Sequence, residues 1–353
     1  MMKILVLSNM SPKKSAPLQG LFVDNQVQRL QAVNKNIDYY KMRWNSDSLL
    51  GRVFKYPVFL LQFFFDIVFK RQKYALIHVH FFFPTIILAA CYKLLINRHV
   101  KIVVTCHGSD VYSYVPPNYL YKKLSYFVDK WIFTSKELQH RFFRCVESAI
   151  VLCAGYDDNL FFPSDIITDK TYDYIQIGSL DYNKGIERFL YLVENFPKQQ
   201  FALVGEGPLK DLVIDATNRF SNLHYLGKQS PKDLVYHIRR SKFLLSLSKH
   251  ESFGLTITEG HACGVPCIAT LTDGSTAQIQ DIVRLIPQLL NNEELVLKKL
   301  KDTLTYFNSL DKTDYANLSC DVSSHTKEFS LSYITEELLA IYSQCLKGHS
   351  NEC

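Results

Sequence analysis

Residue types that could do chemistry gather in the segment SKHESFGLTITEGHACGVPCIAT, residues 248–270. A strand is expected to end at Ser248, and Gly254 then opens a helix. Backbone N–H groups at a helix start bind phosphate, and a glycine there lets the ligand approach closely. Glu251 precedes these donors, whereas Glu259 lies one to two turns into the helix, where its carboxylate can accept hydrogen bonds from sugar hydroxyls. This spacing suits a diphosphate between two hydroxyl-rich groups, although acidic residues also favour an ordinary helix N-terminus.

The elements that must position these residues follow a regular order along the chain. Short apolar runs alternate with helix-length stretches, and the pattern restarts after the polar segment 163–173. Two successive arrays of this kind predict an α/β protein with two Rossmann-like, doubly wound parallel sheets, whose strand C-terminal ends face a central ligand cleft. The expected strands are 3–8, 74–80, 101–107, 130–135, 149–154, 172–179, 200–207, 243–248 and 265–270. The expected helices are 23–33, 84–96, 118–128, 184–195, 208–219, 231–240, 254–263, 277–290 and 332–346.

The chain has 353 residues, which favours two domains at ~150 residues per domain. We place an N-terminal domain at 1–163 and a C-terminal domain at 172–327. The remaining stretch, 328–353, contains a helix that would pack on one domain or return to the first.

Charge is divided unevenly between the two halves of the chain. Residues 1–160 carry 21 basic and 10 acidic side chains, whereas the remainder carries 19 and 24. A basic first half favours an anionic partner such as a membrane surface. No zinc finger or basic-aromatic stacking motif accompanies the charge, so nucleic acid is not an expected partner.

One apolar segment of the basic half, PVFLLQFFFDIVF at 57–69, bears on the membrane question. It is too short to span a bilayer and is interrupted by Asp66. Its aromatic residues and basic flanks suit an amphipathic helix that lies in the membrane interface. A buried helix between two strands is the alternative.

The cysteines and the N-terminus indicate the compartment. The nine cysteines are scattered and include no C-x-x-C pair, so neither a disulfide framework nor a zinc site is expected. The first ten residues hold an apolar run too short for a signal peptide. We therefore expect a cytoplasmic protein, with peripheral attachment to the inner face of the membrane as a further hypothesis.

Segment 248–270 resembles the E-x7-E region of GT-B glycosyltransferases of the GT4, or group 1, family, whose usual form is E-G-F-G-L-x-x-x-E-A-x-A-C-G-V-P. Ten positions match at fixed spacing, while Ser252 replaces a common glycine and Gly260 replaces the usual alanine. The resemblance implies that Glu251 contacts the donor sugar and that Glu259 binds the nucleotide ribose. It also implies that backbone amides near Gly254 and Leu255 hold the donor diphosphate.

Other segments resemble the same family. They are IGSLDYNKGIERFL (177–190), LVGEGP (203–208), LHYLGK (223–228), PLQGLFVDNQVQRL (17–30), IHVHFFFP (77–84), TCHGSDV (105–111) and CAGYDDNLFFP (153–163). Lys184 stands where the family has a lysine that neutralises donor phosphate, and His107 where it has a histidine facing the donor sugar. The resemblance thus assigns catalytic roles to His107, Lys184 and Glu251, donor binding to Gly20, Ser179, Gly207, Gly254, Leu255 and Glu259, and an acceptor-side place to Asp110.

Two departures from the family pattern bear on activity. The family has an arginine where this chain has Ser179, and a charged hydrogen bond of this kind is worth ~1.5–3 kcal/mol. After TDGST (272–276) the usual glycine-rich segment is missing, and the chain runs almost directly into the predicted helix 277–290. These departures keep open a second hypothesis, a catalytically degenerate subunit that acts as a binding or scaffold partner.

The resemblance implies a retaining glycosyltransferase that moves a sugar from a nucleotide-diphosphate sugar to a saccharide or lipid-linked saccharide, in the synthesis of cell-surface polysaccharide or glycolipid. Such enzymes need no cofactor and no bound metal, because lysine, arginine and helix N-termini offset the leaving-group charge. A nicotinamide enzyme is disfavoured, because GEGPLK (205–210) ends in lysine where the dinucleotide fingerprint needs a glycine. The sequence identifies neither the donor sugar nor the acceptor.

Overall fold

A computed structural model of the chain describes residues 2–10, 20–43, 48–164, 169–288 and 292–347. Residues 1–155 together with 331–353 form one compact unit, and residues 156–330 form a second. The change of unit after Gly155 comes earlier than the boundary of 163 expected from the sequence. Tyr156 already belongs to the second unit, because its backbone N–H donates to the carbonyl of Phe329 at 3.0 Å.

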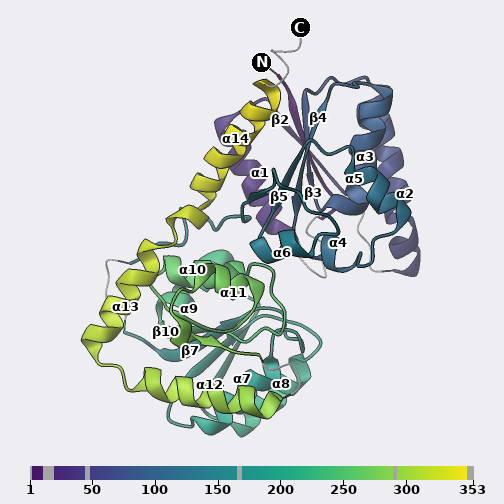
Figure 1. The fold of residues 1–353 in the computed structure, drawn as a ribbon. Coiled ribbons are helices and arrows are strands. Elements are labelled where there is room, and N and C mark those ends of the chain that lie inside the picture. The colour runs from purple at the N-terminus through teal and green to yellow at the C-terminus, as the bar shows by residue number, and fades with distance from the viewer. Residues whose placement is uncertain (1, 11–19, 44–47, 165–168, 289–291, 348–353) are drawn as a thin grey trace. The chain divides into compact units, whose positions relative to one another are not determined.

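The first unit is built on a six-stranded parallel sheet with strand order β2-β1-β3-β4-β5-β6 (Figure 1). The central strands are short apolar runs buried on both faces, as expected for a parallel sheet covered by helices. The strands are β1 (Ile4–Ser8), β2 (Ile37–Lys41), β3 (Leu76–His80), β4 (Lys101–Cys106), β5 (Lys130–Phe133) and β6 (Ile150–Val151).

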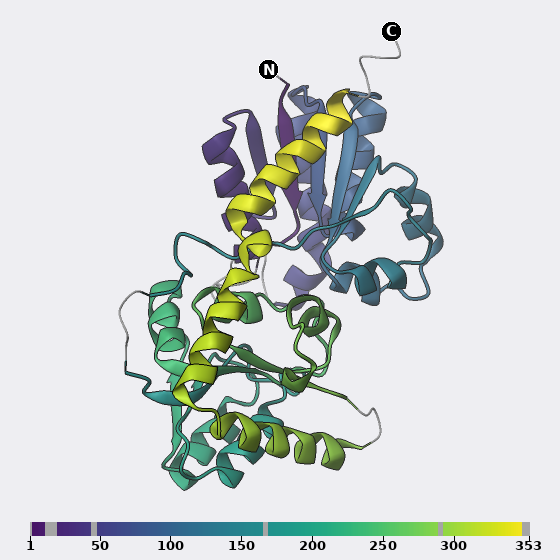
Figure 2. The ribbon, with the colours of Figure 1, turned by 60° about the vertical axis from the view of Figure 1, so that its left-hand side comes forward.

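Helices cover both faces of this sheet. Helices α1 and α14 lie on one face, and α2, α3 and α5 lie on the other (Figures 1 and 2). The helices are α1 (Leu21–Val33), α2 (Leu49–Phe63), α3 (Phe82–Leu95), α4 (Ser109–Tyr112), α5 (Tyr119–Ser125), α6 (Lys136–Arg141) and α14 (Leu331–Lys347). The last helix of the chain therefore belongs to the first unit and packs beside α1.

The second unit has its own six-stranded parallel sheet, with order β12-β11-β10-β7-β8-β9. The strands are β7 (Tyr172–Ile177), β8 (Phe201–Val204), β9 (Leu223–Gly227), β10 (Ser241–Ser246), β11 (Cys267–Thr270) and β12 (Leu285–Ile286). The helices are α7 (Ile186–Asn195), α8 (Lys210–Arg219), α9 (Pro231–Arg239), α10 (Leu255–Ala262), α11 (Asp273–Gln278), α12 (Glu293–Asn308) and α13 (Lys312–Ser324). The expectation of two doubly wound parallel sheets is confirmed.

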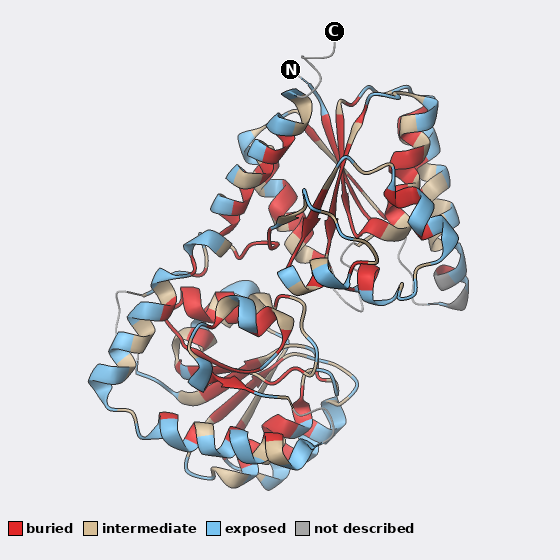
Figure 3. Ribbon diagram, viewed as in Figure 1, coloured by how far each residue is buried: buried red, intermediate tan, exposed pale blue. Residues whose placement is uncertain are grey.

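Two apolar layers hold the second unit together, one on each face of its sheet. Alternate residues of each strand point to opposite faces, so Tyr174 packs with α7, α8 and α12, while its neighbour Ile175 packs with α9 and α10. Figure 3 shows the strands and the inner sides of the helices as buried and the outer helix faces as exposed.

Several elements differ from those expected from the sequence. The predicted helix 277–290 is wrong, because α11 ends at Gln278 and the chain continues through a 3₁₀ turn into β12. Strands β2 and β9 were not predicted, since their sequences IDYYK and LHYLG mix polar and apolar residues. Helices α12 and α13 were also not predicted.

The apolar segment 57–69 forms the end of α2 and a π-helical turn, Phe64–Phe69, that continues it. One side of it is core, because Phe59 and Phe63 are almost fully buried in the first unit. Phe65 and Phe69, in contrast, are 63% and 76% exposed. The segment is therefore amphipathic, with one side in the core as the second hypothesis expected, while its placement in a membrane interface stays a prediction. Among the helices that the structure describes, none is long and apolar enough to cross a membrane.

A pair of glycines in the second unit gives a test of the sheet packing. A Cβ added to Gly205, at the end of β8, would lie 1.8 Å from the carbonyl oxygen of Gly178, at the end of β7. Gly227 also has a positive φ, of 66°, but its added Cβ would meet nothing within 4 Å. We expect Gly205→Ala to lower the free energy of unfolding by at least ~3 kcal/mol and Gly227→Ala by only ~1 kcal/mol. Urea denaturation of both variants measures this difference, and equal costs would contradict the close contact of the two strand ends.

Candidate active site

The predicted residues of the sugar-donor site in the second unit follow two neighbouring strands, after which the chain crosses the sheet in opposite directions. Strands β7 and β10 pair in parallel, with Gln176 opposite Leu245. After β7 the chain crosses to β8 on one side, and after β10 it crosses to β11 on the other. Such a switch point in a parallel sheet opens a crevice at the carboxyl ends of the strands, where ligands bind.

The side chains of Lys184 and Glu251 meet at this edge. Lys184 follows β7 and Glu251 follows β10, and the lysine Nζ donates to the glutamate Oε2. Both side chains are largely buried, with 27% and 17% of their surface exposed. The aliphatic part of the lysine crosses Gly178, where an added Cβ would be 3.5 Å from the lysine Cδ. The structure thus brings together two residues that the sequence placed in separate segments.

Backbone contacts hold the two loops against each other. The Asn183 carbonyl accepts from the N–H of Lys249 at 2.7 Å, and its side chain donates to the His250 carbonyl and accepts from the His250 N–H. Gly185 allows this approach, because an added Cβ would lie 2.2 Å from the carbonyl oxygen of Leu247. Asn183 was not among the predicted residues, although it lies beside Lys184 in the sequence.

Helix α10 begins at the same edge. Gly254 precedes its first residue, Leu255, with a φ of 79°. The first N–H groups of a helix have no intrahelical acceptor and carry a partial positive charge, so this end favours an anion. Gln278 of α11 donates to the carbonyls of Phe253 and Gly254 and so fixes the turn.

Glu259 lies further along α10 and is half-buried. Burial disfavours the charged form of its carboxyl group and raises the pKa of Glu259 to about 8. The side chain is therefore mostly protonated at neutral pH when no ligand is bound. A ligand that donates hydrogen bonds to it would favour the carboxylate.

The two remaining predicted donor-binding residues of this unit, Ser179 and Gly207, follow β7 and β8. Ser179 is exposed, and its carbonyl accepts from the N–H of Asp181 at 3.0 Å. Gly207 lies against the backbone of Leu180, since an added Cβ would be 2.6 Å from the Leu180 nitrogen. No basic side chain takes the place of the family arginine at Ser179 itself.

The predicted residues of the first unit follow β1 and β4, the two strands on either side of β3. His107 follows β4, and its ring packs against Phe81 and Phe22, with centroid distances of 4.5 and 5.0 Å. Phe22 belongs to α1, which begins after Gly20 with a φ of 74°. The family-like segment 17–30 contains this helix start, and its residues 17–19 lie outside the described residues.

Asp110, for which the sequence predicts an acceptor-side place, has its carboxylate engaged by backbone amides. It is 3% exposed, and its carboxylate accepts from the backbone N–H groups of Phe82, His107 and Gly108 at 2.7–3.0 Å. Burial raises the pKa of Asp110, and these amide hydrogen bonds oppose the rise. The carboxylate therefore ties the loop after β3 to the loop after β4.

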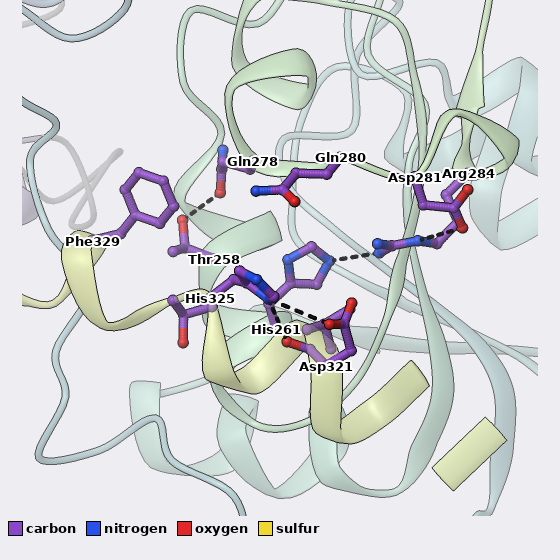
Figure 4. Close-up of a pocket in the computed structure, with 11 residues that line it drawn as sticks. Thr258, His261, Gln278, Gln280, Asp281, Arg284, Asp321, His325 and Phe329 are labelled. Atoms are coloured by element: carbon purple, nitrogen blue, oxygen red, sulfur yellow. Dashed lines mark hydrogen bonds and ion pairs between the residues drawn. The ribbon is translucent and has the colours of Figure 1, made fainter. Parts of the chain in front are cut away.

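A separate polar pocket of the second unit is lined by residues of α10, α11 and α13 (Figure 4). In it, Arg284 Nη1 lies 3.3 Å from His261 Nε2, and the guanidinium also contacts Asp281. None of the predicted site residues lines this pocket. Within the described ranges, no group of three or more His, Cys, Asp or Glu side chains is arranged to hold a metal ion.

Comparisons with protein families cover most of the chain. The family "Glycosyl transferases group 1" matches residues 158–305, and "Glycosyltransferase Family 4" matches residues 43–155. The first match contains Lys184, Glu251 and Glu259, and the second contains His107 and Asp110.

Two relatives match over about two thirds of the chain. N-acetyl-alpha-D-glucosaminyl L-malate synthase of Bacillus anthracis is 29% identical over 278 residues, which are 71% of this chain and 70% of that protein. An uncharacterized glycosyltransferase of Methanocaldococcus jannaschii is 26% identical over 251 residues, 65% of this chain and 69% of that protein.

Solved structures share the fold at low sequence identity. Sucrose-phosphate synthase of Thermosynechococcus elongatus superposes with a TM-score of 0.76 at 16% identity, over 98% of this chain and 100% of that one. HepE of Anabaena, in complex with UDP-glucose, gives a TM-score of 0.70 at 16% identity, again over 98% and 100%. The motifs, the two sheets and these matches agree, and the chain belongs to the group 1, GT4-like glycosyltransferases of GT-B fold.

Proposed function

We propose that this glycosyltransferase transfers a sugar, with retention of anomeric configuration, from a nucleotide-diphosphate sugar to a saccharide or lipid-linked saccharide acceptor. The contact of Lys184 with Glu251 beside the start of α10 carries the proposal. It puts a cation, a carboxylate and free helix N–H donors at one switch point, which is what a diphosphate joined to a sugar needs. The Anabaena neighbour solved with UDP-glucose and the N-acetylglucosaminyl relative support the substrate class.

Lys184 and the first turn of α10 would hold the diphosphate. In the free protein the lysine charge is neutralised by Glu251. A bound diphosphate offers the lysine a stronger partner, which leaves the Glu251 carboxylate to accept hydrogen bonds from the sugar. The charge on the diphosphate grows as the glycosidic bond breaks, so Lys184 stabilises the transition state more than the bound substrate.

Retention needs no covalent glycosyl-enzyme in this scheme. The bond between the anomeric carbon and the phosphate oxygen breaks, and the acceptor oxygen bonds to the same face of that carbon. A phosphate oxygen of the leaving diphosphate takes the acceptor proton. Neither Glu251 nor Glu259 is then a nucleophile, in contrast to the carboxylate pair of retaining glycosidases. We propose that Lys184 and the α10 N-terminus offset the charge without a metal.

The proposal extends to the place of action. We propose that the basic first unit attaches the enzyme to the cytoplasmic membrane surface, for synthesis of cell-surface polysaccharide or glycolipid. Leu61, Phe65 and Phe69 are 59%, 63% and 76% exposed on the amphipathic segment. Lys70, Arg71 and Lys73 follow it directly and are exposed. Apolar side chains bordered by basic ones suit a surface that contains anionic lipid.

Hydrolysis of nucleotide sugars tests the enzymatic role. We expect the purified protein to hydrolyse slowly one donor from a panel of UDP-, GDP- and ADP-sugars. Lys184→Met keeps the aliphatic packing over Gly178 but removes the charge, and should lower this rate at least tenfold, or ~1.4 kcal/mol. Lys198→Met, on an exposed lysine of the same unit, is the matched control and should leave the rate unchanged.

Two results would contradict this proposal. Full activity in Lys184→Met would remove the lysine from the site. Absence of turnover with every donor, in a folded protein supplied with saccharide acceptors, would favour the scaffold hypothesis that the exposed Ser179 keeps open.

The pH dependence of nucleotide affinity tests the role of Glu259. Ribose hydroxyls donate to a carboxylate, so binding selects the ionised form of a group whose pKa is about 8 in the free protein. Affinity should therefore rise about fivefold between pH 7 and 8 and level off above about 9. The terminal phosphate, whose second pKa is about 6, is already ionised over this range and adds little to the change. Calorimetric titration with the nucleoside diphosphate of the active donor measures this change. Glu259→Gln should abolish the pH dependence and Glu251→Gln should keep it, and a flat profile in the wild type would disprove the assignment.

Co-sedimentation with vesicles tests the membrane proposal. Vesicles containing anionic lipid should bind the protein at low salt, neutral vesicles should bind it much less, and added salt should release part of it. Replacing the exposed Phe64, Phe65 and Phe69 by serine should weaken binding without unfolding, because the buried Phe63 is kept. The control replaces three exposed apolar residues of the second unit, Tyr236, Ile282 and Tyr306, and should bind like the wild type. A wild type that ignores anionic vesicles at low salt would refute the proposal.

A further inference from the structure

Three histidines form a row at the carboxyl edge of the first unit's sheet. His78 and His80 are two residues apart in β3, so their side chains share one face of the sheet. His107 directly follows β4, which pairs with β3. The ring centroids are 4.3 Å apart for His78 and His80, and 5.3 Å apart for His80 and His107. Only His107 was predicted as a site residue.

His78 has a structural role. Its Nδ1 lies 2.6 Å from the hydroxyl of Tyr342 on α14, and its Nε2 lies 2.8 Å from the hydroxyl of Thr105 on β4. A hydroxyl can donate or accept, so both imidazole tautomers of His78 are satisfied. This histidine ties the last helix to the sheet and leaves the proton position open.

His80 is in a different position, because its two ring nitrogens are not equivalent. Its Nδ1 lies 3.0 Å from His107 Nε2. Its Nε2 is buried and has no hydrogen-bond partner among the described residues. Only one proton can lie between the two rings, so the tautomer of His80 decides that of His107.

The buried Nε2 decides between the two arrangements. If His107 donated from Nε2, His80 would carry its own proton on Nε2, as a buried N–H with no acceptor. Such a group costs ~1–3 kcal/mol and is rare in folded proteins. If His80 donates from Nδ1, its buried Nε2 is an unprotonated acceptor without a donor among the described residues. Buried acceptors without a partner are less rare in folded proteins than buried N–H groups without one. The second arrangement is favoured, and it leaves the proton of His107 on Nδ1.

We propose that His80 is a positioning residue that holds His107 in its neutral Nδ1–H tautomer, so that His107 acts on the donor sugar as a hydrogen-bond donor and not as a base. The proposal rests on the glycosyltransferase function proposed above. Burial lowers the pKa of His80 to about 3 and that of His107 well below its usual range, which agrees with two neutral rings.

The rest of the His107 environment fixes the ring itself. Phe22 and Phe81 pack against it, and Asp110 accepts from its backbone N–H. Phe81 adopts a φ of 63°, a conformation that costs a bulky residue energy and persists only where the surroundings impose it. With the backbone and the ring plane fixed, the proton position is the property that His80 sets.

Nitrogen NMR of the imidazole side chains tests the tautomer directly. In ¹⁵N-histidine-labelled full-length protein, with His107→Gln used for assignment, we expect His107 to show a protonated Nδ1 and an unprotonated Nε2 at neutral pH. A protonated Nε2 would overturn the proposal. This measurement uses the folded wild type and needs no turnover, so it is independent of whether the proposed function is correct.

Two variants of His80 test the consequence for catalysis. His80→Asn keeps an N–H donor near the position of Nδ1, whereas His80→Phe keeps the ring size and removes the donor. We expect His80→Phe to lower kcat for donor hydrolysis at least tenfold with little change in KM, and to yield a mixture of His107 tautomers, while His80→Asn restores both within a few-fold. Wild-type kcat and an unchanged tautomer in His80→Phe would overturn the proposal. If His80→Phe does not fold, His80→Asn serves as the test. A folded and active His80→Asn in which His107 lacks the Nδ1–H tautomer would also overturn the proposal.

Discussion

The close approach of two loops at the carboxyl ends of β7 and β10 is the constraint on which the second unit depends. The strands are neighbours, but the chain crosses from β7 to β8 on one side of the pair and from β10 to β11 on the other. Contact is possible because Gly185 has no Cβ to meet the carbonyl of Leu247, and Asn183 pairs with the backbone of the opposite loop. Lys184 and Glu251 therefore meet at low conformational cost, since the backbone has already positioned both of them.

The first unit uses the same topology with a different chemistry. The edge of its sheet after β3 and β4 holds neutral imidazoles and an amide-bound carboxylate in place of a lysine–glutamate ion pair. Burial lowers the pKa of His80 and His107, and the Asp110 carboxylate is fully engaged by backbone amides. In the proposed function the second unit would supply charge that offsets a diphosphate, whereas the first would supply an oriented hydrogen-bond donor. This division is physically sensible, because a cation gains most where negative charge develops.

The sequence predicted those parts of the fold where the local pattern and the tertiary environment agree. Strands such as β1 and β4 are continuous apolar runs, and the segment around Glu251 and Glu259 carries a specific motif. The sequence did not predict β2 or β9. Their residues mix polar and apolar types, and each segment is a strand because it pairs with a neighbouring strand. Helix 277–290 was wrongly predicted, because apolar spacing alone could not show that Leu285 and Ile286 pair with β11.

Side-chain partners within the site were the least predictable feature. The motif placed Lys184 and Glu251 in the same ligand site, but their direct ion pair depends on which strands are adjacent. His80 lies in the family-like segment 77–84, but the sequence assigns it no role. Only the structure shows that its Nδ1 faces His107 and that its Nε2 is buried without a partner among the described residues. Likewise, the segment 57–69 is neither wholly core nor wholly surface, since Phe63 and Phe65 lie on opposite sides of it.

Hydrogen exchange with and without a nucleoside diphosphate tests the central claim most directly, that the β7–β10 switch point is the donor site. The account predicts protection on binding in the loop 178–185 and in residues 251–259, the segments that hold Lys184, Glu251 and the start of α10. Protection confined to the pocket of Figure 4, around His261, Arg284 and His325, would contradict the account and move the ligand to the other site.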